Sequence, residues 1–173
     1  MPDATGLELI AQAVRERVGD DAVVATDYSH EHATLEVAPG SIRDMIRFLC
    51  TEADEPFPRL MSLHGCDYLP EEPRFGIHYE LLSMERAERL RVKLRVGADH
   101  ARIASVVDMQ PTADFQEREV FDMFGVEFEG HPDMRRILMP EDYVGFPQRR
   151  DFPMGGEPVI FTFNEHKLPR WYE

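Results

Sequence analysis

The stretch from residue 117 to residue 133 holds the side chains most able to do chemistry. Glu117, Glu119, Asp122, His131 and Asp133 supply carboxylates and an imidazole, the groups that bind metal ions or transfer protons. Their spacing argues against such a site, because residues two apart on a helix point in different directions. The sequence also has no HExxH motif and no pair of histidines one helical turn apart. We therefore expect no metal-binding or catalytic residue in this chain.

Other chemical motifs are missing or weak. The sequence has no P-loop, no GxGxxG and no GxSxG. His64 and Cys66 are two apart on an expected strand and would share a face, but a thiolate–imidazole pair needs closer, directed geometry. The two cysteines, Cys50 and Cys66, are too few for a four-thiolate zinc or iron–sulfur site, and we interpret them as reduced thiols of a cytoplasmic protein.

Arginines and carboxylates alternate along the same region and beyond it. The arginines are Arg118, Arg135, Arg136, Arg149 and Arg150, and the acids are Glu117, Glu119, Asp122, Asp133, Glu141, Asp142 and Asp151. A guanidinium binds a carboxylate through two parallel hydrogen bonds and also stacks on aromatic rings. A solvated salt-bridge face is the alternative, at under about 1 kcal/mol per pair. The nearby prolines and aromatic residues favour an interface with another protein.

The elements that position these residues can be read from periodicity. Helices are expected over residues 5–18, from Ser41 onward, and over 112–125, with Thr5 as an N-cap and Asp44 near a capping-box position. Strands are expected over 22–26, 34–37, 58–68, 75–81 and 90–96, the last two as an antiparallel pair with one buried and one solvated face. This order predicts an α+β, two-layer domain with a mostly antiparallel sheet and helices on one face.

The regular patterns stop after Glu129. Residues 131–173 carry six of the thirteen prolines, which excludes long helices and central strands. They also carry many large apolar residues, among them Phe146, Phe152, Phe161 and Trp171. Disorder is one interpretation; we favour an extended, irregular C-terminal arm that is ordered against a partner. The expected organisation is a domain over 1–130 followed by this arm over 131–173.

Composition narrows the classes of function. The chain of 173 residues has a net charge of −14, and residues 1–130 hold 13 Lys and Arg against 26 Asp and Glu, which argues against nucleic acid as a partner. No apolar run is long enough to span a bilayer, and the N-terminal residues do not resemble a signal peptide. We expect a protein that reaches a membrane only indirectly, through a complex.

The region 117–153 closely resembles the signature of one known family. It reads EREVFDMFGVEFEGHPDMRRILMPEDYVGFPQRRDFP, and it is similar to the signature of the 30 kDa-type subunit, or C subunit, of respiratory complex I. The matching residues include Glu117, Arg118, Glu119, Asp122, Gly125, Gly130, His131, Pro132, Arg135, Arg136, Pro140, Glu141, Asp142, Gly145, Arg149, Arg150 and Asp151. Gln116, Met134 and Tyr143 stand where the family usually has Trp, Leu and Trp. The resemblance extends back to about residue 58.

This resemblance implies a non-catalytic structural subunit of the peripheral arm of the proton-translocating NADH-quinone oxidoreductase. Such a subunit holds no cofactor of its own, whereas the complex uses FMN, iron–sulfur clusters, NADH and quinone. It packs on the quinone-site subunit and neighbours two subunits that hold iron–sulfur clusters (the D, B and I subunits, respectively), on the cytoplasmic side of the bacterial inner membrane. The matching signature residues are then expected to bind partner subunits.

Two alternatives stay open. The first is the equivalent subunit of a related membrane-bound hydrogenase or ferredoxin-linked complex, which shares the signature. The second, from another class, is a free metal-dependent hydrolase that uses His131 and nearby carboxylates. The subunits that co-purify with the chain would distinguish the first, and metal analysis of the isolated chain the second.

Overall fold

The computed structural model describes residues 2–99 and 101–153. The helices are α1 (Ala4–Val18), α2 (Ile42–Arg47), which continues in a π-helical turn (Phe48–Glu52), and α3 (Ala113–Phe124). The strands are β1 (Val23–Ser29), β2 (His32–Val37), β3 (Arg59–Asp67), β4 (Phe75–Ser83), β5 (Glu88–Val96), β6 (Arg102–Ala104) and β7 (Glu127–Glu129). Within the described part of the chain, no helix is both long and apolar enough to cross a membrane.

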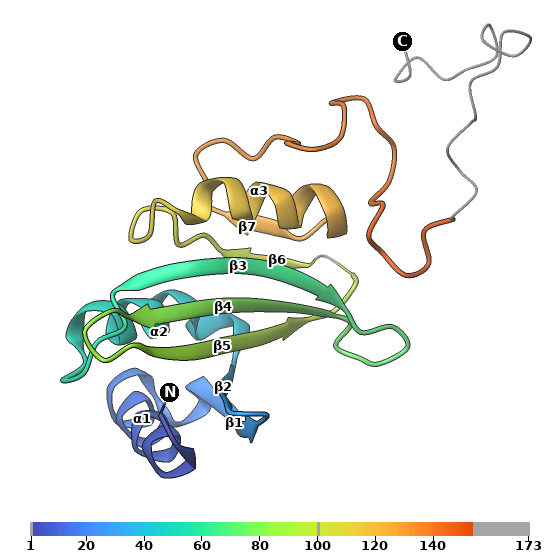
Figure 1. The fold of residues 1–173 in the computed structure, drawn as a ribbon. Coiled ribbons are helices and arrows are strands. Elements are labelled where there is room, and N and C mark those ends of the chain that lie inside the picture. The colour runs from blue at the N-terminus through green and yellow to red at the C-terminus, as the bar shows by residue number, and fades with distance from the viewer. Residues whose placement is uncertain (1, 100, 154–173) are drawn as a thin grey trace, which may run out of the picture.

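A five-stranded mixed sheet forms the centre of the fold (Figure 1), in the order β1-β2-β5-β4-β3. Its neighbours are antiparallel except for β2 and β5, which run parallel with Leu35 opposite Val92. The predicted α+β class, the mostly antiparallel sheet and the antiparallel pair of β4 and β5 are therefore confirmed. The short parallel pair of β6 and β7 was not predicted, because three-residue strands leave almost no periodicity to detect.

The helices pack on one face of this sheet. Alternate residues of β4 and β5, such as Ile77, Tyr79 and Val92, are fully buried in one core with Leu7 of α1 and Ile46 of α2. On the other face, ion pairs link Arg91 to Glu80 and Lys93 to Glu36. This second face was expected to be solvated throughout, but His78 on it is only 6% exposed.

The Tyr68 ring explains that burial. Its hydroxyl lies 3.1 Å from His78 Nε2, and its ring lies under the cations of Lys93 and Arg95. The His64 ring stacks on His78 from the neighbouring strand, with ring centroids 5.1 Å apart. Aromatic rings therefore cover one end of the polar sheet face without any helix.

Two helix caps and one turn differ from the sequence-based expectation. Asp3, not Thr5, caps α1, because its carboxylate accepts a hydrogen bond from the Gly6 N–H at 2.7 Å. Helix α2 begins at Ile42, one residue after the predicted start at Ser41. Ser41 occupies the N-cap position without a side-chain hydrogen bond, and Asp44 pairs with Arg47. The turn between β1 and β2 is only His30-Glu31, both at positive φ, because the strands extend further than predicted.

Candidate partner-binding surface

Helix α3 positions the first signature residues, and two of its carboxylates point inward. Glu117 and Asp122 are both 0% exposed, five residues apart, whereas Glu119 is exposed. Glu117 Oε1 accepts a hydrogen bond from the Val106 N–H at 2.9 Å, and Oε2 has no hydrogen-bond partner among the described residues. Burial raises the pKa of Glu117 to about 7 because its charged form has lost most of its hydration.

Asp122 fastens the segment that follows the helix. Its Oδ2 accepts hydrogen bonds from the backbone N–H groups of Ile137, Leu138 and Met139 at 3.0, 2.7 and 2.8 Å, and its Oδ1 accepts one from Arg136 at 2.6 Å. Burial alone would raise the pKa of this carboxyl, but the hydrogen bonds outweigh burial and hold the pKa below its ordinary value. One side chain thus satisfies three consecutive amides that form no secondary structure.

Two arginines complete this attachment. Arg136 Nη2 donates to the Gly145 carbonyl at 3.0 Å, and the same guanidinium lies over the rings of Tyr143 and Phe146. Arg118 on α3 donates to the carbonyl oxygens of Arg135 and Arg136, both at 3.1 Å. The predicted arginine network therefore exists, and much of it binds backbone rather than carboxylates.

His131 has a structural role. Its Nδ1 accepts a hydrogen bond from the Asp133 N–H at 3.0 Å, so Nε2 carries the proton and donates it to the Asp114 carbonyl at 3.2 Å. The side chain is 0% exposed. Among residues 2–99 and 101–153, no group of three or more His, Cys, Asp or Glu side chains is placed to hold a metal ion.

The far end of the segment is fixed by an ion-pair triad that sequence analysis missed. Arg74 donates two hydrogen bonds to Asp67, at 2.9 and 2.7 Å, and two to Asp151, at 2.9 and 2.6 Å. Asp67 also accepts from the Arg150 N–H at 2.8 Å. Hydrogen bonds from Arg74 hold the pKa of Asp67 far below its ordinary value. Arg150 lies 83 residues after Asp67, and Asp151 lies 77 residues after Arg74. No local sequence pattern therefore indicates these two contacts.

Arg149 and two glycines close the packing against α3. Arg149 donates to the Phe124 carbonyl at 2.7 Å and lies between the rings of Phe75 and Phe146. Gly125 follows the helix at φ +74°, and a Cβ there would lie 2.6 Å from Arg149 and Phe146. Gly145, at φ +109°, similarly leaves no room for a Cβ beside Phe152.

These contacts correct one expectation for residues 131–153. We expected this segment to depend on another protein for its polar partners, but Asp122, Arg136, Arg118 and Arg74 bind it to its own domain. The remaining signature residues Pro132, Arg135, Pro140, Glu141, Asp142 and Arg150 are exposed, as are the apolar side chains of Phe115 (64%), Leu138 (59%) and Val144 (83%). The predicted part of the arm beyond Pro153, with Phe161 and Trp171, lies outside the described residues.

The described residues display an irregular surface held in one shape by buried charges. An α+β domain that carries such a surface fits the class of proteins that serve as subunits of larger assemblies.

Comparison with known proteins identifies the family. Residues 35–158 match the model for the respiratory-chain NADH dehydrogenase, 30 Kd subunit, and the chain belongs to this family. It is 39% identical to the C subunit of NADH-quinone oxidoreductase from Roseiflexus sp. (strain RS-1) over 97% of this chain and 94% of that protein. It is 41% identical to the C subunit from Herpetosiphon aurantiacus over 90% and 86%.

Solved structures agree with the fold. A trypsin-resistant fragment (1–134) of Nqo5 superposes with a TM-score of 0.58 at 28% identity, covering 72% of this chain and 98% of the fragment. A chain of the membrane-bound sulfane sulfur reductase, an archaeal respiratory membrane complex, gives a TM-score of 0.70 at 28% identity, covering 87% and 86%. The same architecture is thus found in more than one respiratory complex.

Proposed function

We propose that this chain is a non-catalytic structural subunit in the peripheral arm of NADH-quinone oxidoreductase. In this role it sits on the cytoplasmic side of the bacterial inner membrane and packs on the quinone-site subunit, next to the subunits that hold iron–sulfur clusters. FMN, the clusters and quinone belong to its partners. The proposal is supported by relatives named as the C subunit of this enzyme, which match nearly the whole chain at about 40% identity.

The observation that carries the docking part of the proposal is the contrast between charges turned inward and apolar side chains turned outward. The buried Asp122 and the half-buried Arg136 fix the shape of the segment, while Phe115, Leu138 and Val144 remain exposed on α3 and the segment. Burying one large apolar side chain contributes roughly 1.5–3 kcal/mol. A pre-shaped surface also loses little conformational entropy on binding.

An equivalent subunit of another respiratory membrane complex is the second candidate. It is favoured by the superposition on a chain of the archaeal sulfane sulfur reductase complex, at a TM-score of 0.70. The two candidate functions predict the same docking surface but different partner proteins. Mass spectrometry of the proteins in the native assembly separates them, because only the first includes an NADH-oxidising flavoprotein.

The test of the docking surface is Leu138→Asp, made in the chromosomal copy of the gene. Leu138 is 59% exposed, so the isolated variant is expected to fold with an unchanged Tm. A buried unpaired charge at an interface is strongly unfavourable, so we expect at least tenfold less variant chain in the purified complex and a parallel loss of NADH:quinone activity.

Met84→Asp is the matched control, because Met84 is 64% exposed in the turn between β4 and β5, away from the signature segment. Normal incorporation of the Leu138 variant would refute the docking surface. If the isolated Leu138→Asp variant has a reduced Tm, Leu138→Ser, which adds no charge, tests the docking surface in its place.

A further inference from the structure

A groove lies beside α1, at the opposite end of the molecule from α3 and the signature segment (Figure 1). It consists of two adjoining hollows of about 440 and 390 Å³ that share Leu9, Ile10, Glu55 and Phe57. Its apolar lining comes from α1 and from the stretch 48–57: Leu9, Ile10, Ala13, Phe48, Leu49 and Phe57. We refer to this feature as the α1 groove.

Only part of the apolar lining is explained by the core, to which Leu49 and Phe57 belong. Helix α1 buries Leu7, Ala11 and Val14 against the sheet, whereas Leu9 points away and is 64% exposed. A single exposed leucine is common on protein surfaces. Here it borders a hollow that also contains the half-buried side chains of Ile10 and Phe48, so the apolar area is continuous and concave.

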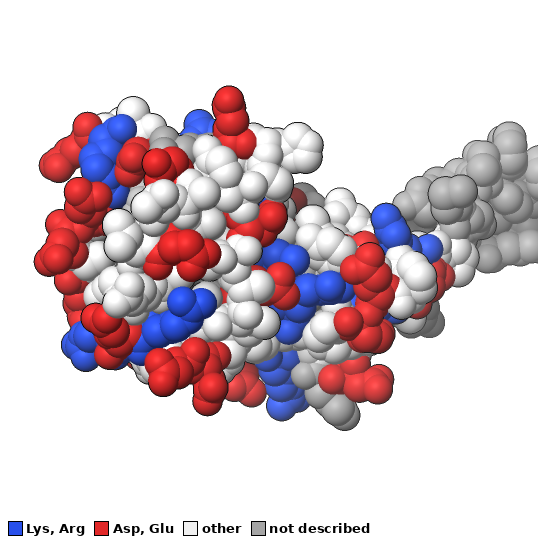
Figure 2. Space-filling model, turned by 90° about the horizontal axis from the view of Figure 1, so that it is seen from below, with Lys and Arg blue, Asp and Glu red and all other residues white. Residues whose placement is uncertain are grey.

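Acidic side chains surround the groove: Asp3, Glu52, Asp54, Glu55 and Glu88. Two arginines neutralise part of this charge. Arg17 pairs with Glu52 at 2.8 Å. Arg86 pairs with Glu88 at 2.8 Å and with Glu55 at 3.9 Å while lying over the Phe57 ring. Asp54 has no ion-pair partner within the described ranges. Seen from the side that carries α1, red carboxylates and fewer blue basic groups lie between uncharged areas (Figure 2).

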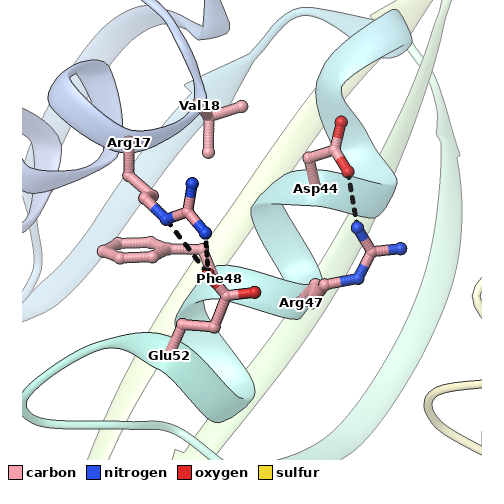
Figure 3. Close-up of a pocket in the computed structure, with 6 residues that line it drawn as sticks. All are labelled: Arg17, Val18, Asp44, Arg47, Phe48 and Glu52. Atoms are coloured by element: carbon pink, nitrogen blue, oxygen red, sulfur yellow. Dashed lines mark hydrogen bonds and ion pairs between the residues drawn. The ribbon is translucent and has the colours of Figure 1, made fainter.

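One end of the groove is visible in detail in Figure 3, where the Phe48 ring lies beneath the guanidinium of Arg17, next to Glu52. A smaller hollow of about 210 Å³ continues there and shares Phe48 and Glu52 with the groove. Both of its arginines, Arg17 and Arg47, are already paired with carboxylates at 2.8 and 2.9 Å. The charges at this end therefore balance, and the acidic rim is confined to the two larger hollows.

We propose that the α1 groove is a second docking surface and that its occupant is a basic amphipathic helix of another subunit. An apolar helix face fits a hydrophobic groove through residues spaced one turn apart, and lysine or arginine stems beside it reach an acidic rim. The charge of the rim selects a cationic helix over an acidic or neutral one. The groove is separate from the signature segment, because it lies beside α1 at the opposite end of the molecule.

The first test uses a synthetic 18-residue Leu/Lys amphipathic helix and its Leu/Glu twin as probes, with the full ¹⁵N-labelled chain. The Leu/Lys helix is expected to shift backbone amide signals of Leu9, Ile10, Ala13, Phe48 and Phe57, and to bind more weakly as salt rises. Shifts spread over every acidic surface, or equal binding of the Leu/Glu twin, would overturn the proposal.

Variants separate the apolar contribution to binding from the electrostatic contribution. Leu9→Ser removes exposed apolar surface and is expected to weaken binding about tenfold, whereas Val144→Ser, at the opposite end of the molecule, leaves it unchanged. The double variant Asp54→Asn/Glu55→Gln is expected to weaken binding several-fold at low salt only. Unchanged affinity of the Leu9 variant would refute the apolar contact.

The second test uses the native assembly, with the photocross-linking residue p-benzoylphenylalanine in place of Leu9. The expected adduct joins position 9 to a Lys- and Arg-rich amphipathic helix of another subunit. An adduct with residues 154–173 of this chain, an adduct with lipid, or no adduct would overturn the proposal. Because Leu138 is untouched, failure here is distinguishable from failure of the proposed docking on the quinone-site subunit.

Discussion

At the scale of single residues, two equally buried carboxylates of α3 behave in opposite ways. Asp122 accepts four hydrogen bonds, including one from a cation, and its pKa is below the ordinary value despite burial. Glu117 accepts one backbone bond, and burial raises its pKa to about 7. The larger loss of hydration at Glu117 and the larger number of donors at Asp122 together account for the opposite pKa directions.

Glu117 makes the stability of the chain depend on pH. Its pKa is about 7 in the folded state and near 4.5 in the unfolded chain, so between these values the folded state binds more protons. Between pH 5 and pH 8 the contribution of Glu117 to the free energy of unfolding therefore falls as pH rises, by on the order of 2–3 kcal/mol. Burial lowers the pKa of His78 to about 3, so this histidine contributes in the opposite direction over the same range. Glu117→Gln keeps an acceptor for the Val106 N–H and is expected to remove the Glu117 contribution, so that the stability difference between variant and wild type, measured by urea denaturation, changes by that amount between pH 5 and pH 8.

The exposed Glu119 provides the control on the same helix, and Glu119→Gln is expected to retain the wild-type pH dependence. Buried Tyr79 does not contribute between pH 5 and pH 8, because burial and the nearby Glu117 charge both raise the pKa of its hydroxyl above its ordinary value. An unaltered pH profile in the Glu117 variant would show that Glu117 does not cause the pH dependence assigned to it.

At the scale of elements, the end of α3 determines where the following segment runs. Gly125 adopts φ +74° as the C-cap, and its missing Cβ leaves room for Arg149 and Phe146 to pack on the helix end. Helix termination and attachment of the segment therefore depend on the same position.

A pair of glycine substitutions separates the cost of a positive φ from the cost of filling the space that Arg149 and Phe146 occupy. Gly130→Ala, at φ +85° with no atom within 4 Å of the new Cβ, carries only the backbone cost, about 1 kcal/mol. Gly125→Ala carries that cost and a clash with Arg149 and Phe146, for a total of about 2–4 kcal/mol. Chemical denaturation measures both, and equal losses would mean that the side chains above Gly125 move aside freely.

The sequence predicted the elements well where periodicity is strong and poorly elsewhere. Alternation in 75–81 and 90–96 located β4 and β5, and the apolar spacing of 5–18 located α1 within one residue. The path of residues 131–153 could not be predicted, because its amides bind side chains such as Asp122 instead of forming a regular ladder. The Asp67–Arg74–Asp151 triad was equally hidden, since Arg74 and Asp151 are 77 residues apart.

At the scale of the whole molecule, the segment 131–153 is part of the folded body and needs Asp122 to remain so. Asp122→Asn removes the charge and leaves one oxygen for three amides and a guanidinium. We expect a loss of about 2–4 kcal/mol in the free energy of unfolding and at least tenfold faster hydrogen exchange at Ile137, Leu138 and Met139.

Asp133→Asn is the matched control. Asp133 pairs with Arg135 at 2.6 Å, but both side chains are largely exposed, so its replacement is expected to leave stability and exchange almost unchanged. Slow exchange at residues 137–139 in the Asp122 variant would show that other contacts, such as those of Arg118, suffice to hold the segment.

The parallel pairing of β2 with β5 has a consequence for synthesis. It joins the β1–β2 hairpin, which is complete by residue 37, to β5, which ends at residue 96. In the five-stranded sheet, this pairing alone connects the β1–β2 hairpin to the strands β3, β4 and β5. While the chain leaves the ribosome, the inner edge of that hairpin stays open until residue 96 has emerged. We expect nascent chains stalled before this point to bind chaperones through that edge, and longer ones to be released.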